Sequence, residues 1–66
     1  MQIIVNGEPH ASPDAVSVTG LLESLAVPDG RVAVEVNEEI VPRNAFDTRQ
    51  LHEGDRIEIV HFVGGG

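Results

Sequence analysis

The stretch RIEIVHFV (residues 56–63) decides the fold of this chain. Polar and apolar residues alternate over its first four positions, residues 56–59, which is the period-two pattern of a β-strand with one face toward a core. We expect Ile57 and Ile59 to face that core. The opposite face then carries Glu58, Val60 and Phe62.

A second strand is predicted at the start of the chain, over residues 1–5. It is followed by Asn6-Gly7, a strong signal for a two-residue hairpin turn. The returning strand, residues 8–11, is polar, and Pro9 marks it as an edge strand. We expect the first and last strands to pair in the centre of the sheet.

One helix is predicted after this hairpin, because apolar residues recur there at the spacing of a single helix face. Ser17 is the expected N-cap, and the turn at residues 28–30 is expected to end the helix. The apolar face consists of Val18, Leu21, Leu22 and Leu25.

The remaining elements complete a layered α+β domain. Alternating valines predict a strand over residues 31–37, and Ile40-Val41 predicts a short strand before Pro42. Phe46 and Leu51 are the expected apolar anchors of the following loop, and residues 53–55 form a turn. The predicted fold is a mixed sheet of four to five strands with one main helix on one face. This is the β-grasp arrangement of ubiquitin, with a domain at residues 1–63 and a flexible tail at residues 64–66.

Length and composition exclude several classes of function. Sixty-six residues without cysteine cannot form a large enzyme with a deep active site, and no Cys/His cluster predicts a bound metal. Eleven acidic residues against four arginines give a net charge of −7, which would repel nucleic acid and favours a basic protein partner. No apolar run predicts a membrane span or signal peptide, so we expect a cytoplasmic protein.

The clearest indication of a chemical function in this sequence is a run of three glycines, Gly64, Gly65 and Gly66. Glycine has no side chain, so this segment can enter a narrow cleft of a partner enzyme as a thin thread. The Gly66 carboxylate is unhindered, but it must be activated before it can react. The chain has no phosphate-binding loop of its own, so the activation requires a partner that uses ATP.

Three further motifs resemble the ThiS family of ubiquitin-like sulfur carriers in thiamin biosynthesis (the ThiS/MoaD group). They are Asn37 with IVPR (residues 40–43), EGDRIEI (residues 53–59) and HFVGGG (residues 61–66). The resemblance implies that a ThiF-type adenylyltransferase uses ATP and magnesium to adenylate Gly66. It also implies that a persulfide protein supplies sulfur, and that thiazole synthase (ThiG) consumes the resulting thiocarboxylate. The chain is then a carrier and not an enzyme, with no cofactor of its own.

The strand periodicity suggests where partners dock. Ile4 is expected on the same outer face as Val60 and Phe62, so these three side chains would form an exposed patch beside the tail. Arg43 matches the family motif and is either a partner contact or part of an ion pair that fixes its loop. The histidines have no regular spacing and are not expected to bind a metal; they are His10, His52 and His61.

Several related functions remain open from the sequence. A carrier of the same architecture could serve molybdopterin synthase, cysteine synthesis or tRNA thiolation. A protein modifier attached through Gly66 and a simple interaction module are alternatives from other classes. For the sulfur carrier we expect a monomer when the protein is free.

Overall fold

The secondary structure follows the order that the sequence predicts. The computed structural model of the chain describes residues 1–27 and 29–62. Short 3₁₀ turns at Asp29–Arg31 and Arg43–Ala45 precede the third strand and follow the fourth. In chain order the main elements are β1 (Gln2–Val5), β2 (Glu8–Ala11), α1 (Val18–Ser24), β3 (Val32–Val36), β4 (Glu39–Val41) and β5 (Arg56–His61).

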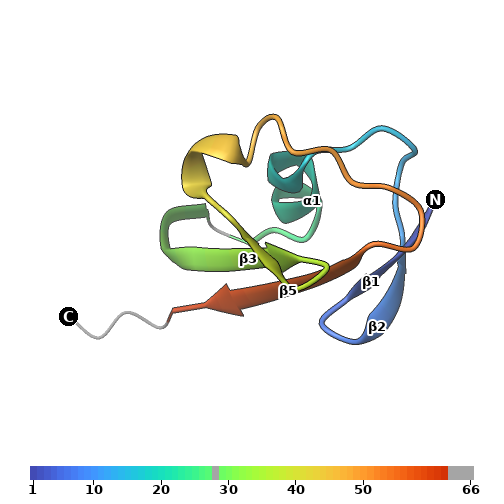
Figure 1. Cartoon of the computed structure of the whole chain (residues 1–66), viewed down its shortest axis with the longest axis horizontal. Helices are drawn as coiled ribbons and strands as arrows, with labels where there is room; N and C mark the ends of the chain where they lie inside the picture. Colours follow the sequence, from blue (N-terminus) through green and yellow to red (C-terminus); the bar gives the residue numbers. More distant parts are fainter. Residues whose placement is uncertain (28, 63–66) are drawn as a thin grey trace.

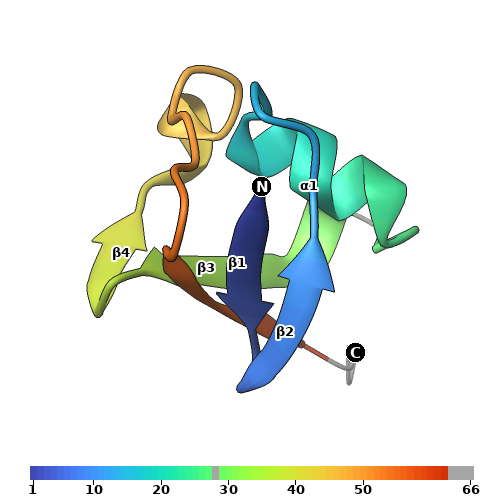
Figure 2. The same ribbon diagram turned by 90° about the vertical axis from the view of Figure 1, so that its right-hand side faces the viewer.

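The central strand of the five-stranded sheet is β5. The strand order is β2-β1-β5-β3-β4, with β1 and β5 parallel and the other neighbouring pairs antiparallel. Figures 1 and 2 show α1 packed over one face of this sheet. The predicted β-grasp arrangement is therefore confirmed, and no helix covers the opposite face in the part of the chain that the structure describes.

The predicted hairpin between β1 and β2 is also confirmed. Asn6 and Gly7 both have positive φ, at 49° and 84°, as a type I′ turn requires. Pro9 lies in the edge strand β2. The Ser12 N–H donates to the Met1 carbonyl at 2.8 Å, so the alternating antiparallel pattern turns the Pro9 nitrogen away from β1. No bond of the ladder is lost at this proline.

Helix α1 places its apolar face on the sheet, and a side chain caps its first turn. The Ser17 hydroxyl accepts a hydrogen bond from the Gly20 N–H at 3.1 Å, which confirms the predicted N-cap. Leu25 is half-buried at the C-cap. The fully buried residues of the helix are Val18, Leu21 and Leu22.

The helix ends earlier than the turn at residues 28–30. The N–H groups of Ala26 and Val27 donate to the carbonyls of Glu23 and Leu22, which is the bonding pattern of a Schellman motif. Ala26 occupies the left-handed position of this motif at φ 57°, where glycine is the usual residue. The helix therefore ends in its own C-cap, before the residues to which the sequence assigned the stop.

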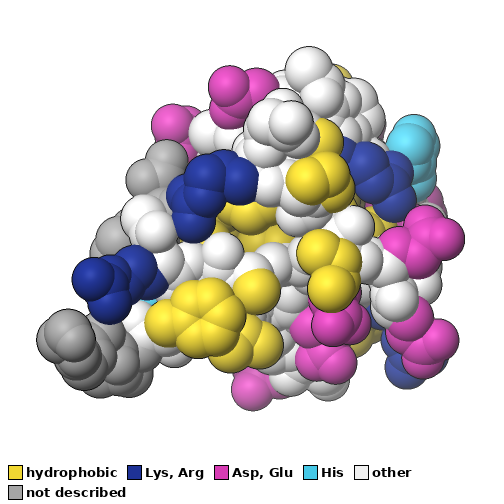
Figure 3. All heavy atoms as spheres, turned by 60° about the vertical axis from the view of Figure 1, so that its left-hand side comes forward, with side chains coloured by type: hydrophobic (Ala, Val, Ile, Leu, Met, Phe, Trp, Pro, Cys, Tyr) yellow, Lys and Arg dark blue, Asp and Glu magenta, His cyan; other side chains and the backbone are white. Residues whose placement is uncertain are grey.

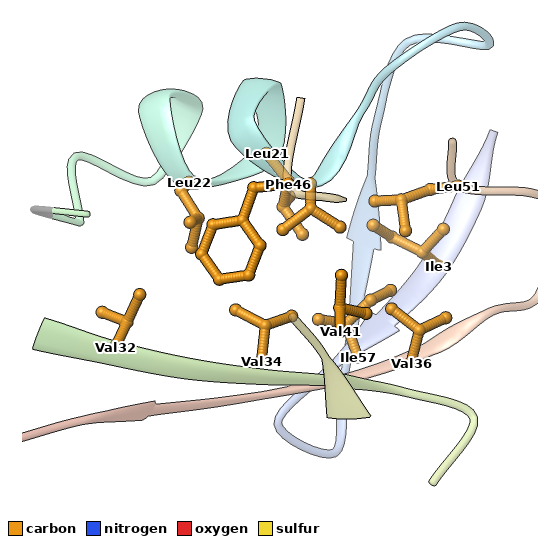
Figure 4. Close-up of a cluster of buried hydrophobic side chains, with 11 residues drawn as sticks. Ile3, Leu21, Leu22, Val32, Val34, Val36, Val41, Phe46, Leu51 and Ile57 are labelled. Carbon is orange, nitrogen blue, oxygen red and sulfur yellow. The ribbon is translucent and has the colours of Figure 1, made fainter. Parts of the chain in front are cut away.

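One hydrophobic core lies between α1 and the inner face of the sheet (Figure 4). The loop after β4 closes it with Phe46 and Leu51, which are 5% and 2% exposed, so the two predicted anchors are confirmed. The strands contribute alternate residues, as the period-two pattern predicts. Those residues are Ile3, Val32, Val34, Val36, Val41 and Ile57.

A buried carboxylate organises the turn that leads into β5. Asp55 accepts hydrogen bonds from the Asn37 side-chain amide at 3.0 Å and from the His52 N–H at 2.8 Å. The preceding residue, Gly54, has φ 81° and so needs the conformational freedom of glycine. The predicted turn at residues 53–55 is confirmed, and its aspartate is 8% exposed.

Within residues 1–27 and 29–62, the structure contains no helix of the length and hydrophobicity that crossing a membrane requires.

Candidate functional site

The candidate site is the outer face of β5 near its C-terminal end. Val60 and Phe62 are each 54% exposed, whereas Ile57 is 1% exposed and Ile59 is half-buried. The predicted facing of these side chains is therefore confirmed. Gly64, Gly65 and Gly66, which the sequence predicts as the reactive tail, lie outside the described residues, as does residue 63.

Strand β3 holds this end of β5 in place. Val60 lies opposite Ala33 in the antiparallel register. Two residue pairs further on, just beyond both strands, the Phe62 N–H donates to the Arg31 carbonyl at 2.8 Å. The exposed side chains of Val60, on β5, and of Phe62, just after it, are therefore presented by backbone that is hydrogen-bonded on the β3 side.

Ile4 differs from its prediction. It is half-buried, so the expectation of an exposed Ile4 is wrong. It lies opposite Arg56 in the parallel register, four residues before Val60, or about 13 Å along the strand at about 3.3 Å per residue. Ile4 lines a shallow hollow of about 290 Å³ instead, with Gly7, Glu38, Arg56, Ile57 and Glu58.

An exposed apolar residue that the sequence analysis missed lies on β4. Ile40 is 74% exposed, and its neighbour Val41 is 7% exposed. Ile40 lies opposite Glu35 in the register, and Glu35 in turn lies opposite Glu58, so the three share the outer face. A three-residue strand is too short for alternation to show which side chain faces the core. The nearby Pro42 is the only other local signal, and it does not indicate whether Ile40 or Val41 faces the core.

Arg43 connects two loops near the end of β5. Its Nη2 atom donates to the Gly30 carbonyl at 3.0 Å, and its guanidinium carbon lies 5.8 Å from the centre of the Phe46 ring, a cation–π distance. Arg43 therefore has a role in fixing its loop, and a contact with a partner stays a prediction. Figure 3 shows hydrophobic side chains beside cationic ones, which are arginines because the chain has no lysine.

No metal site is found in the part of the chain that the structure describes, where no group of three or more His, Asp or Glu side chains is arranged to hold an ion. His52 lies 3.9 Å from the Asp55 carboxylate through its Nδ1 atom. His10 and His61 are on strands β2 and β5.

Comparison with known proteins identifies the group to which this domain belongs. The model of the ThiS family matches residues 3–66. The chain belongs to the ThiS family. The match begins in β1 and includes the three glycines at residues 64–66.

Individual ThiS-family relatives agree with this assignment. A sulfur carrier protein ThiS from Bacillus subtilis is 42% identical over 80% of both chains. The crystal structure of a thiamine biosynthesis protein (ThiS) from Geobacter metallireducens superposes with a TM-score of 0.85, at 39% identity and with all of both chains covered.

A thiazole synthase from Magnetococcus marinus is 44% identical over the whole of this chain. The chain spans about a fifth of the length of that relative, since the match covers 20% of it.

Proposed function

We propose that this ThiS-family chain is a sulfur carrier for thiamin biosynthesis and carries the sulfur on Gly66. The observation that carries the proposal is the family match, which extends to residue 66 and so includes the glycine tail. The relative from Bacillus subtilis, which bears the name sulfur carrier protein, supports it. We expect the carrier to act in the cytoplasm and to be a monomer when free.

The Gly66 carboxylate is the proposed reactive group. A ThiF-type adenylyltransferase joins it to the AMP part of ATP, with the help of magnesium, and pyrophosphate leaves. The outer sulfur of a persulfide on another protein then attacks the acyl carbon and AMP leaves, which gives an acyl disulfide. A thiol reductant cleaves its S–S bond, so that Gly66 ends in a thiocarboxylate and the donor's sulfur ends in a disulfide with that thiol. Thiazole synthase takes this sulfur, and the carboxylate is regenerated. The chain has no cysteine, so it has no thiol of its own that could carry the sulfur instead.

The proposed docking surface for the adenylyltransferase is centred on Val60 and Phe62. Arg43, which binds the Gly30 carbonyl, lies at its side, and the half-buried Ile4, opposite Arg56, lies at its far margin. The two apolar side chains are exposed and lie four and two residues before Gly64. A partner that covered them would receive the following residues in its own cleft. This arrangement supports a carrier that is bound by its folded domain and modified at its end. The strongly acidic composition favours a partner with a basic surface.

The intact mass of the protein tests the proposal. The chain is incubated with a ThiF-type adenylyltransferase, ATP, magnesium and a sulfur source. We expect a mass increase equal to the exchange of one oxygen for one sulfur, located on Gly66 by fragmentation. Addition of thiazole synthase and its other substrates should reverse the increase. An unchanged mass, with the partner shown to be active on a known carrier, would contradict the proposal.

Two variants make the experiment specific to the tail. Deletion of Gly65 and Gly66 removes the proposed reactive group and should abolish the mass change. One alanine added after Gly66 moves the carboxylate and thickens the thread, so it should also block adenylation. Both variants should unfold like the wild type, because neither change touches the core. Normal adenylation of the extended variant would contradict the role of a free Gly66 carboxylate.

A further inference from the structure

The side-chain amide of Asn6 acts as an additional peptide group in the sheet. Asn6 directly follows β1, and its backbone N–H donates to the Ile57 carbonyl at 2.8 Å. Its Oδ1 atom accepts a hydrogen bond from the Ile59 N–H at 2.8 Å, and its Nδ2 atom donates to the Ile59 carbonyl at 3.3 Å. One side chain thus bonds both main-chain groups of one β5 residue, as a neighbouring strand would.

The Asn6 side-chain amide continues the hydrogen bonding on the β1 side of β5 beyond the point where the backbone of β1 leaves the sheet. The β1–β5 register ends with Val5 opposite Ile57, because the chain enters the hairpin at Asn6 and Gly7. Figure 1 shows β5 continuing past the β1–β2 hairpin. The Asn6 amide therefore holds one more residue, Ile59, after the backbone of β1 has left the sheet.

The position of this contact relates it to the candidate site. Ile59 directly precedes Val60, and Phe62 follows two residues later. On its other side this end of β5 is held by β3 and by the residue that precedes β3, since the Phe62 N–H donates to the Arg31 carbonyl. Asn6 thus supplies the hydrogen bonds from the β1 side closest to the exposed apolar pair.

From this geometry we infer that Asn6 is a positioning residue for the reactions at the C-terminal segment. The inference rests on the proposed function. Without the amide, the end of β5 is held from one side, and its two exposed side chains are less ordered before docking. A partner must then provide the free energy that orders them. Because this cost falls equally on the bound substrate and the transition state, it raises KM and leaves kcat unchanged.

Asn37 provides a matched control at the other end of the same strand. It also has positive φ, at 52°, and its Oδ1 atom accepts a hydrogen bond from the Arg56 N–H at 3.0 Å. Its Nδ2 atom donates to the buried Asp55 carboxylate. Asn37 therefore uses the same device where β5 begins, far along the strand from Phe62.

The test compares Asn6→Gly with Asn37→Gly. Glycine adopts positive φ without strain, so each change removes the side-chain amide and leaves the turn. For Asn6→Gly we expect about tenfold faster hydrogen exchange at the Ile59 amide, which corresponds to about 1.4 kcal/mol. We also expect a KM for the carrier that is about three- to tenfold higher in adenylation, measured by pyrophosphate release, with kcat unchanged. For Asn37→Gly we expect a lower Tm with a wild-type KM.

A conservative variant separates positioning from simple stability. Asn6→Asp keeps an oxygen that accepts from the Ile59 N–H but loses the donor to its carbonyl, so its KM should lie between those of the wild type and Asn6→Gly. A wild-type KM for Asn6→Gly, or an equal rise in KM for Asn37→Gly, would overturn the inference and leave the proposed function intact. A wild-type chain that is not adenylated at all would overturn the proposed function and, with it, the positioning role.

Discussion

Replacement of Phe62 by alanine is the sharpest test of the docking surface. Phe62 is 54% exposed in the free chain. A phenylalanine side chain contributes about 200 Å² of surface, so a partner that covered the exposed half would remove about 100 Å² from water. At about 25 cal/mol per Å² this burial corresponds to about 2.5 kcal/mol, or about 60-fold in Kd. Only part of the free energy calculated from buried area appears as affinity, because binding also orders side chains and desolvates polar groups. We therefore expect Phe62→Ala to raise the Kd for the adenylyltransferase by about 10- to 50-fold.

Titration calorimetry measures this change in Kd, and circular dichroism follows unfolding because the chain has no tryptophan or tyrosine to report by fluorescence. Ile57→Ala is the matched control on the same strand. Ile57 is 1% exposed, and its truncation should lower the free energy of unfolding by about 2–5 kcal/mol. Phe62→Ala should lower it by less than about 1 kcal/mol. An unchanged Kd would refute the docking argument, and a loss of stability equal to that of Ile57→Ala would show that Phe62 belongs to the core.

Two further predictions concern stability and use urea unfolding followed by circular dichroism. Asp55→Ala should lower the free energy of unfolding by about 2–4 kcal/mol, because it removes the carboxylate that binds Asn37 and the His52 N–H; a loss below about 1 kcal/mol would indicate that water replaces the carboxylate. Ala26→Gly should raise the free energy of unfolding by about 0.5–1 kcal/mol, because glycine relieves the left-handed conformation at φ 57°. A decrease would mean that the flexibility of glycine in the unfolded chain outweighs the relieved strain.

The fold could be predicted from the sequence because its elements have strong local signals. The alternation around Ile57 and Ile59 defines β5, and the Asn6-Gly7 pair defines the first hairpin. The helix face and its Ser17 cap follow from spacing and side-chain chemistry. In a chain of this size one helix and a few strands have few ways to bury their apolar faces together, so correct elements lead to the correct architecture.

The features that the sequence did not reveal depend on contacts between distant residues. Ile40 and Val41 are equally apolar, and only the pairing of β4 with β3 decides that Ile40 is exposed. Ile4 is on the predicted face, but its strand lies between β2 and β5, with Pro9 and Arg56 as register neighbours, and it is half-buried. The contacts of Asn6 span more than 50 positions in the chain, to Ile59, whereas its local pattern predicts no more than a turn.

Pro9 also affects the tendency of this chain to aggregate at high protein concentration. The regular N–H and C=O groups at the edge of a sheet can recruit a strand from another molecule and begin an aggregate. At the β2 edge Pro9 has no backbone N–H, so one outward-facing hydrogen-bond donor is missing and a ring carbon takes its place. The opposite edge, β4, offers three residues, and the first of them is the charged Glu39. Both edge strands of the sheet are therefore poor templates for a strand from another copy of the chain. We expect that a high protein concentration alone does not cause this chain to form ordered fibres.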